Sequence, residues 1–312
     1  MAIYHFHVCM VSRGTGKSAV AVAAHRAGET LFDERLGETQ NFSRRSPGVA
    51  HKEILAPENA PAWVHDRGQL WNHVEAGEKR KDSGLAREVQ VALPGELTPV
   101  QQVELVRDFV REAFVHEGMV GDVAINTSNA KNPQACILLT TRGLDPTSPT
   151  GFGQKKTEWN ARARLFLWRK SWAEIANRHL ERAGHDCRID HRSYAERGIA
   201  LTPTSHLGVS VARRGIDGRD LIQERIVEHD RIVRENGEAI KDDPSIALQA
   251  LILERRTFTR ADMIRWLEGH TADDTQLQEA LAAVMASGLL VPLNTEGAEP
   301  RYTVAESMSL ET

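Results

Sequence analysis

Two histidines near the start of the chain have a spacing that suits metal binding. His5 and His7 are separated by one residue, and residues two apart on a β-strand point to the same face. Imidazoles held in this way can bind a transition metal. The alternative is that they are ordinary members of an opening strand, residues 2–11, whose other face carries Tyr4 and Phe6.

The segment GTGKS at 14–18 has part of the pattern of a phosphate-binding loop. The complete pattern, G-x-x-x-x-G-K-[ST], requires glycine at the position of Val11, so we exclude nucleotide binding by this loop. Arg13 and Lys17 instead suit contacts with backbone phosphates at the start of a helix. Ordinary surface charge is the alternative.

Cysteine usage and hydropathy exclude several classes of protein. Cys9, Cys136 and Cys187 are far apart and form no CxxC pair, which argues against a disulfide framework and against a thiolate zinc site. No apolar run approaches the roughly 20 residues of a membrane span, and the first residues lack the pattern of a signal peptide. We therefore expect a cytoplasmic protein with no membrane partner.

The formal charge of −4 is unevenly distributed along the chain. Residues 151–220 hold 14 Lys/Arg against 8 Asp/Glu, whereas residues 241–312 hold 6 against 12. A locally basic surface suits a polyanionic partner such as nucleic acid, although it can also be the solvated face of one helix.

Hydrophobic periodicity predicts the elements that would position these side chains. Strands are expected at 2–11, 88–93, 119–125 and 135–141, and helices at 17–26, 70–81, 98–118 and 158–183. Thr98 and Pro99 suit the start of the third helix. The order of these elements predicts an α+β fold in which one antiparallel sheet is covered by helices.

A second domain is expected after the polar stretch ENGEAIKDDP at 235–244, so that the domains would span 1–235 and 236–312. Helices are predicted at 245–254, 259–268 and 274–286, followed by a hairpin. Three short helices and a hairpin suggest a small winged-helix-like domain. Its acidic balance favours a docking or linker role over DNA binding.

Many segments, in order, resemble the MobA/MobL (MobQ) relaxase domain, as in the amino-terminal part of TraA-type plasmid transfer proteins. They include SRGTGKSAVAVAAHRAGE, EKRKDSGLAREVQVALPGELT, NPQACILLTTRGL and IDHRSYAERGIALTPTSHLG, within residues 2–210. The tail, with FTRADMIRWL and RYTVAESMSLE, resembles the linker that joins such domains to a helicase. We expect no helicase motor in this chain.

The resemblance implies an HUH-type relaxase fold and a DNA-nicking activity. Relaxases of this family cut one strand of a transfer origin by attack of a tyrosine phenolate on the phosphodiester. A divalent ion, Mg²⁺ or Mn²⁺, held by three histidines withdraws charge from the phosphoryl oxygens. The implied partners are single-stranded transfer-origin DNA, other conjugation proteins and a helicase.

The reacting groups of the family are replaced in this sequence. The position of the tyrosine falls at His25, and the three ligand positions fall at Asn126, Gln134 and Cys136. Amides are weak neutral donors, and a thiolate prefers softer ions than Mg²⁺. We therefore expect no cofactor, with Mg²⁺ or Mn²⁺ at this place only if activity persists.

Other positions also match the family pattern. Glu88 corresponds to an acidic residue near the reacting tyrosine, where it could assist proton removal; the alternative is a structural carboxylate paired with Arg87 or Arg142. The resemblance and the charge pattern together give a set of candidate DNA contacts: Arg13, Lys17, Arg26, Arg142 and Arg192.

The sequence thus predicts a relaxase-type protein that binds single-stranded transfer-origin DNA and has lost its nicking chemistry. One alternative is a nicking transesterase that remains active, with His25 as the nucleophile. Another is a non-catalytic interaction module of the transfer complex. Tyr4, Tyr194 and Tyr302 are the only tyrosines, and none occupies the nucleophile position.

Overall fold

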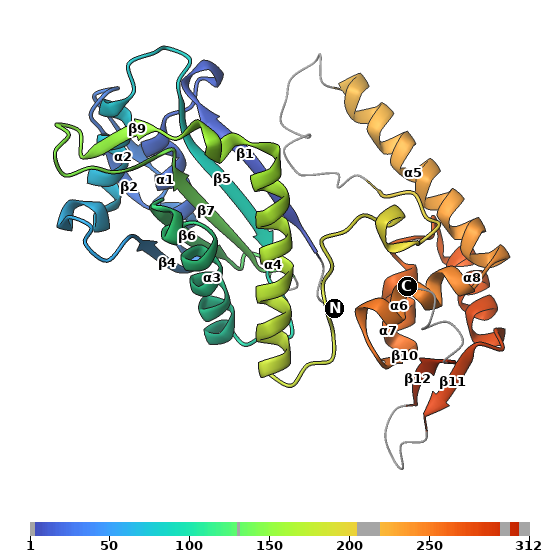
Figure 1. Cartoon of the computed structure of the whole chain (residues 1–312). Helices are drawn as coiled ribbons and strands as arrows, with labels where there is room; N and C mark the ends of the chain where they lie inside the picture. The colour runs from blue at the N-terminus through green and yellow to red at the C-terminus, as the bar shows by residue number, and fades with distance from the viewer. Residues whose placement is uncertain (1–3, 130–131, 205–218, 294–299, 306–312) are drawn as a thin grey trace. The chain divides into compact units, whose positions relative to one another are not determined.

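A computed structural model describes residues 4–129, 132–204, 219–293 and 300–305 (Figure 1). The chain forms two compact units. The N-terminal unit comprises Met1–His185 and Ile189–His191, and the C-terminal unit comprises Asp186–Arg188 and Arg192–Thr312. The domain boundary expected near residue 235 stays a prediction.

The N-terminal unit is built on a five-stranded antiparallel sheet. Its strands, in spatial order, are β1 (Phe6–Ser12), β5 (Gly84–Ala92), β7 (Gln134–Thr140), β6 (Gly121–Asn126) and β4 (Val49–Leu55). Four of them match the strands expected from alternation, apart from Met1–Ile3, which lie outside the described residues. The edge strand β4 was not predicted.

Helices α3 (Pro99–Ala113) and α4 (Arg162–Arg182) cover one face of this sheet (Figure 1). Phe109 of α3 makes an edge-to-face contact with Phe6 of β1 and another with Trp172 of α4. As the sequence predicts, Thr98 caps the start of α3, and its side chain forms a capping box with Gln101. The helix ends at Ala113, earlier than the expected end at Gly118.

Helices α1 (Ala19–Ala27) and α2 (Arg67–Gly77) cover the other face. Val11, Ala86 and Leu138 of the sheet share a buried cluster with Ala19 and Ala23 of α1. The small side chains of α1 allow its backbone to approach the strands closely. The prediction of a helix at 17–26 is confirmed, whereas the helix expected at 70–81 begins and ends earlier, because Asp66 caps it.

Smaller elements complete the N-terminal unit, and they were not predicted. Two hairpins pair β2 (Thr30–Asp33) with β3 (Glu38–Asn41) and β8 (Arg142–Leu144) with β9 (Phe152–Lys155). Short 3₁₀ helices lie at Arg13–Thr15, Ser43–Gly48, Ala62–His65, Val115–Glu117 and Thr157–Asn160.

The C-terminal unit contains α5 (Arg219–Asp242), α6 (Ser245–Glu254), α7 (Arg260–Leu267) and α8 (Asp274–Ala286). A 3₁₀ helix lies at Ala195–Arg197, and a three-stranded sheet has the order β10 (Phe258–Thr259), β12 (Arg301–Val304), β11 (Leu290–Leu293). The last three helices and the hairpin match the predicted ranges.

The polar stretch at 235–244, expected to separate two domains, is mostly helical. Residues 235–242 form the end of α5. Its buried side chains include Ile240 and the polar Asn236, whose amide exchanges two hydrogen bonds with the backbone of Thr202. The polar and charged composition of this stretch suggests a linker, because it does not reveal which of its side chains are buried. The winged-helix interpretation of the unit stays a prediction. Among the described residues, no helix is both long and apolar enough to cross a membrane.

Candidate functional site

The hairpin of β6 and β7 brings the three predicted ligand positions together. Asn126 lies opposite Gln134, and Cys136 lies opposite Ala124. Because side chains alternate along a strand, these positions share one face of the sheet. It is the α1 face, since Leu138, two residues beyond Cys136, packs in the cluster with α1.

Helix α1 places His25 and Arg26 near its C-terminal end, above this face. The ring of His25 makes an edge-to-face contact with Phe42, with 5.1 Å between centroids. Gly28 ends the helix in the left-handed conformation. The structure thus sets the predicted nucleophile position and the predicted ligand positions on the same side of the sheet.

Glu88 of β5 also belongs to the α1 face, since it pairs with Leu138 in the strand register. It forms an ion pair with Arg26, and its side chain is only 4% exposed. The alternative expectation of pairing with Arg87 or Arg142 is therefore wrong. Arg87 lies on the opposite face, where it contacts Asn160 and Trp168, and Arg142 pairs with Glu78.

The electrostatics of this face keep the carboxylate charged and the thiols neutral. Burial acts to raise the pKa of Glu88, but the charge of Arg26 and the hydrogen bonds to Glu88 more than offset it, so the pKa lies below its usual value. Burial raises the pKa of the Cys136 thiol, and burial together with Glu88 raises that of Cys9. A thiol held in this way is a poor metal ligand, because the thiolate is the coordinating form.

The three positions do not fit a hard divalent cation. The amide oxygen of Asn126 accepts a hydrogen bond from the backbone of Ser128 at 2.9 Å, Gln134 offers a neutral amide, and Cys136 is protonated. Mg²⁺ and Mn²⁺ prefer oxygen ligands, above all carboxylates, and none of these three side chains supplies a charged oxygen. In the described part of the chain, no group of three or more His, Cys, Asp or Glu is arranged to hold a metal ion.

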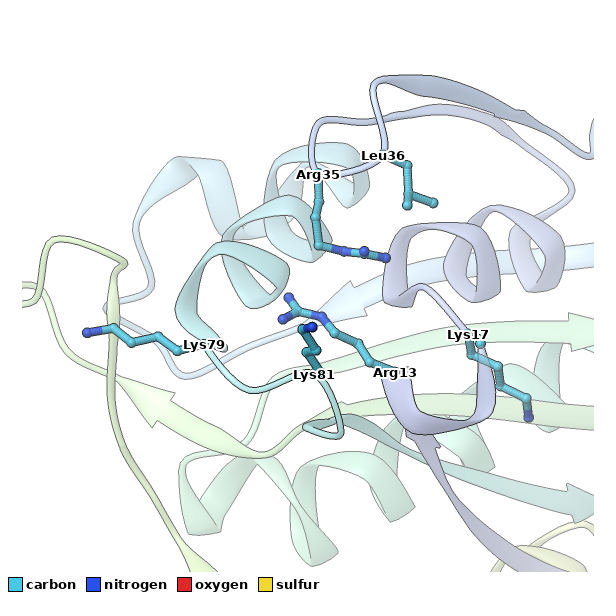
Figure 2. Close-up of a pocket in the computed structure, with 7 residues that line it drawn as sticks. Arg13, Lys17, Arg35, Leu36, Lys79 and Lys81 are labelled. Carbon is cyan, nitrogen blue, oxygen red and sulfur yellow. The ribbon is translucent and has the colours of Figure 1, made fainter.

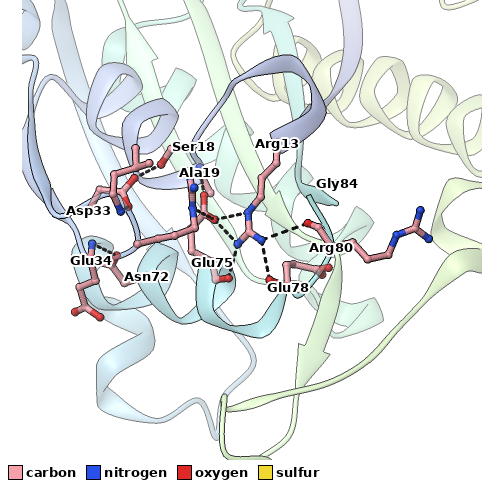
Figure 3. Close-up of polar contacts among 12 residues, drawn as sticks. Arg13, Ser18, Ala19, Asp33, Glu34, Asn72, Glu75, Glu78, Arg80 and Gly84 are labelled. Carbon is pink, nitrogen blue, oxygen red and sulfur yellow. Dashed lines mark hydrogen bonds and ion pairs between the residues drawn. The ribbon is translucent and has the colours of Figure 1, made fainter. Parts of the chain in front are cut away.

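The predicted DNA contacts are spread over the molecule. Arg13 lies at the opposite end of α1 from His25, and its guanidinium donates to the Glu75 carboxylate and to the carbonyls of Glu78 and Arg80 (Figure 3). Arg142 bonds to Glu78 and to a carbonyl of β9. Lys17 is exposed. Arg192 is exposed and belongs to the C-terminal unit.

Glu75 is the residue that sequence reasoning missed. Its carboxylate accepts hydrogen bonds from Arg13 and, at 2.8 Å, from the backbone of Ala19 at the start of α1 (Figure 3). It also accepts a hydrogen bond from Arg35. The three donors come from separate loops and a helix start, so no local sequence pattern connects them. The run of basic residues at 79–81 could have indicated that Glu75 lies in a positively charged region.

Comparisons with known proteins identify the family of this chain. Residues 17–215 match the model of the MobA/MobL family. The chain is 33% identical to a probable conjugal transfer protein TraA of Sinorhizobium fredii, over all of this chain but 32% of that protein. It is 33% identical to the mobilization protein MobL of Acidithiobacillus ferridurans, over 85% of this chain and 80% of that one.

One solved structure, described as "Molecular Basis of Vancomycin Resistance Transfer in Staphylococcus aureus", is similar to this chain with a TM-score of 0.58 and 36% identity. The match covers 62% of this chain and all of the other. The chain spans about a third of the length of the TraA relatives that it matches.

Proposed function

We propose, since this chain belongs to the MobA/MobL family, that it binds single-stranded DNA of a transfer origin without cutting it. The observation that carries the proposal is the replacement of the donors on the α1 face. Asn126, Gln134 and Cys136 lie side by side on the hairpin and offer only neutral groups to a cation. The names of the relatives, which refer to conjugal transfer and mobilization, support transfer-origin DNA as the partner.

The absence of a phenol is the second part of this argument. His25 occupies the nucleophile position, and its neighbour Arg26 is paired with Glu88. An imidazole nitrogen can attack phosphorus, but without a cation to withdraw charge the step is slow. Glu88 therefore serves as a structural partner of Arg26 and not as a base.

A surface of α4 supports binding of single strands. Arg162, Phe166, Arg169 and Lys170 recur at helical spacing and are exposed, so they form one stripe, named here the α4 stripe. Phe166 is 53% exposed despite its apolar ring. Basic side chains that follow the backbone and aromatic rings on which bases stack are the usual parts of a single-strand binding surface.

The cleavage test uses a labelled transfer-origin strand, the protein and Mn²⁺. We expect no covalent protein–DNA product on a denaturing gel. The positive control is the variant His25→Tyr/Asn126→His/Gln134→His/Cys136→His, which restores the groups expected of the family. A covalent product from the unmodified chain would contradict the proposal and favour the alternative with His25 as nucleophile.

The binding test measures affinity for the same strand at several salt concentrations. We expect affinity to fall as salt rises, because bound phosphates release counterions. Phe166→Ala should weaken binding by about 1 to 3 kcal/mol for each base that stacks on this ring. The matched control is Val100→Ala, which also removes an exposed apolar side chain but from α3, outside the α4 stripe. No binding even at low salt would refute the proposal.

A further inference from the structure

A basic pocket lies at the start of α1, at the other end of the helix from His25. It has a volume of about 370 Å³ and is lined by Gly16, Leu36 and five cationic side chains: Arg13, Lys17, Arg35, Lys79 and Lys81 (Figure 2). The cations come from three separate loops, after β1, after β2 and after α2. We call this site the basic pocket.

The inner wall of the basic pocket is held in place by Glu75. Its buried carboxylate bonds to Arg13 at 2.6 Å and to Arg35 at 3.0 Å, and Figure 2 shows the two guanidinium groups close together. One carboxylate faces two guanidinium groups, so this cluster keeps a net positive charge. Arg13 also donates to the backbone carbonyls of Glu75, Glu78 and Arg80, which fixes its position further.

The rim of the basic pocket is formed by three lysines. Lys81 lines the pocket, and Lys17 and Lys79 extend to opposite sides of it (Figure 2). All three are exposed, and among the described residues their ammonium groups form no ion pair. The three ammonium groups repel one another and the positively charged cluster of Arg13, Arg35 and Glu75. A bound anion relieves this repulsion.

Two backbone amides at the helix start already have partners within the protein. The amide of Ala19 is bonded to Glu75 and that of Ala21 to Ser18. A ligand in the basic pocket would therefore be held mainly by side-chain charges, whereas a nucleotide-binding loop cradles phosphates with its backbone amides.

We propose that the basic pocket is a binding site for phosphate groups, and that a DNA strand is their source. The assignment of DNA as the source of these phosphates rests on the proposed function. Among the lining residues Leu36 is the only apolar one and none is aromatic, so the pocket suits backbone phosphates and offers no surface for a base. The volume exceeds that needed for one small ion.

The placement gives the site a definite role in holding the strand. Ala19 and His25 are six residues apart on α1, which corresponds to about 9 Å along the helix. A strand whose phosphates occupy the basic pocket can therefore continue along α1 toward the face that carries His25 and the hairpin.

The test compares two variants that each remove three positive charges. The pocket variant is Lys17→Ala/Lys79→Ala/Lys81→Ala, which leaves Arg13, Arg35 and Glu75 intact. The control variant is Arg111→Ala/Arg182→Ala/Arg260→Ala, whose side chains are exposed and lie outside the basic pocket. Equal melting temperatures without ligand show that both variants are folded.

Two probes are used on each protein. The first is a labelled single-stranded oligonucleotide, titrated across a range of salt concentrations. Loss of three phosphate contacts should reduce the slope of log affinity against log salt by about 2 in the pocket variant. The second is inorganic tripolyphosphate, which should raise the melting temperature of the unmodified protein and of the control variant but not that of the pocket variant.

The outcomes separate the two proposals. A reduced salt slope for the oligonucleotide together with loss of the stabilisation by tripolyphosphate in the pocket variant supports a phosphate site used by DNA. Loss of the tripolyphosphate response alone supports a phosphate site filled from another source. If both responses survive in the pocket variant, the inference is overturned while the proposed function stands. If the unmodified protein fails to bind DNA, the proposed function falls, and the tripolyphosphate arm still tests the basic pocket.

Discussion

Glu88 and Arg26 form a buried ion pair on the face where the family's reacting groups are expected. The pKa of Glu88 lies below its usual value, because Arg26 and the hydrogen bonds to Glu88 outweigh the cost of burial. A carboxyl with a depressed pKa stabilises the folded state above its unfolded pKa of about 4.3, and this contribution is lost as the pH falls through the folded pKa.

We therefore predict that Glu88→Gln flattens the loss of stability in acid. At neutral pH the variant should lose about 2 kcal/mol of unfolding free energy, because Arg26 keeps only a neutral partner. Below about pH 4 the difference from the unmodified protein should shrink. Urea unfolding followed at several pH values measures both effects.

Some acid sensitivity should persist in this variant, because the pKa values of Glu29, Glu53 and Glu78 are also lowered by cationic partners despite the opposing effect of burial. A constant difference between the two proteins at every pH would contradict the role given to Glu88.

The partner of Glu88 shows what sequence reasoning can reach at the scale of residues. Family resemblance singled out Glu88 as a candidate site residue, but sequence proximity suggested Arg87 as a partner. Adjacent residues on a strand point to opposite faces, and this rule alone excludes Arg87. Identifying Arg26 required knowing which face α1 covers, and that is a tertiary fact.

At the scale of elements, the hairpin of β6 and β7 sets the spacing of the three predicted ligand positions. Asn126 and Gln134 are directly opposite, and Cys136 is two residues further along β7. The arrangement depends on backbone pairing, which side chains at these positions do not control. The pairing therefore fixes the spacing of these three positions, whichever side chains occupy them.

We predict that Asn126→His/Gln134→His/Cys136→His binds Mn²⁺, whereas the unmodified chain does not. Three imidazoles on one face provide the donors that the present side chains lack. Calorimetric titration and the electron paramagnetic resonance of Mn²⁺ measure the difference. The control Asn126→His/Gln134→His should bind more weakly, and equal binding by all proteins would show that the metal lies elsewhere.

The end of α1 depends on Gly28, which has a φ of 62° and lies against the 3₁₀ helix at Ser43–Gly48. A Cβ at this position would come within 2.7 Å of the backbone nitrogen of Ser46. Gly37 has a similar φ of 69°, but a Cβ there would meet nothing within 4 Å. The two glycines separate backbone strain from steric contact.

We predict that Gly28→Ala destabilises the protein by about 3 kcal/mol and Gly37→Ala by about 1 kcal/mol. The smaller value is the strain of the left-handed conformation alone, and the larger adds the clash with Ser46. Chemical denaturation of both variants provides the measurement. Equal losses of unfolding free energy in the two variants would mean that the backbone at Ser46 can shift away at little energetic cost.

The elements that the sequence predicted well are those with strong periodicity, such as β7, α3 and α8. The elements that the sequence did not predict depend on long-range strand pairing or on the burial of polar side chains. The edge strand β4 carries polar side chains, and its pairing with β6 is long-range. The end of α5 is rich in charged residues, but Asn236 and Ile240 are buried. Burial of a polar group with a distant partner leaves no local signal.

At the scale of the whole molecule, each of the two compact units has its own buried residues. Leu105 of α3 is fully buried in the N-terminal unit, and Leu281 of α8 is 2% exposed in the C-terminal unit. The basic stretch at 151–220 lies mostly in the first unit as far as it is described, while the acidic stretch at 241–312 lies in the second.

We predict that thermal unfolding shows two transitions, one for each unit. Leu105→Ala and Leu281→Ala should each destabilise by about 2 to 5 kcal/mol, and each should lower a different transition. Differential scanning calorimetry resolves them. A single transition lowered equally by both substitutions would show that the units unfold together.

The strand pairing of the β6–β7 hairpin has a consequence for how such a protein evolves. Backbone pairing fixes where the side chains of this hairpin lie, whereas the side chains at Asn126, Gln134 and Cys136 decide what this face can bind. A few codon changes at these three positions can therefore exchange one binding chemistry for another while the architecture is kept.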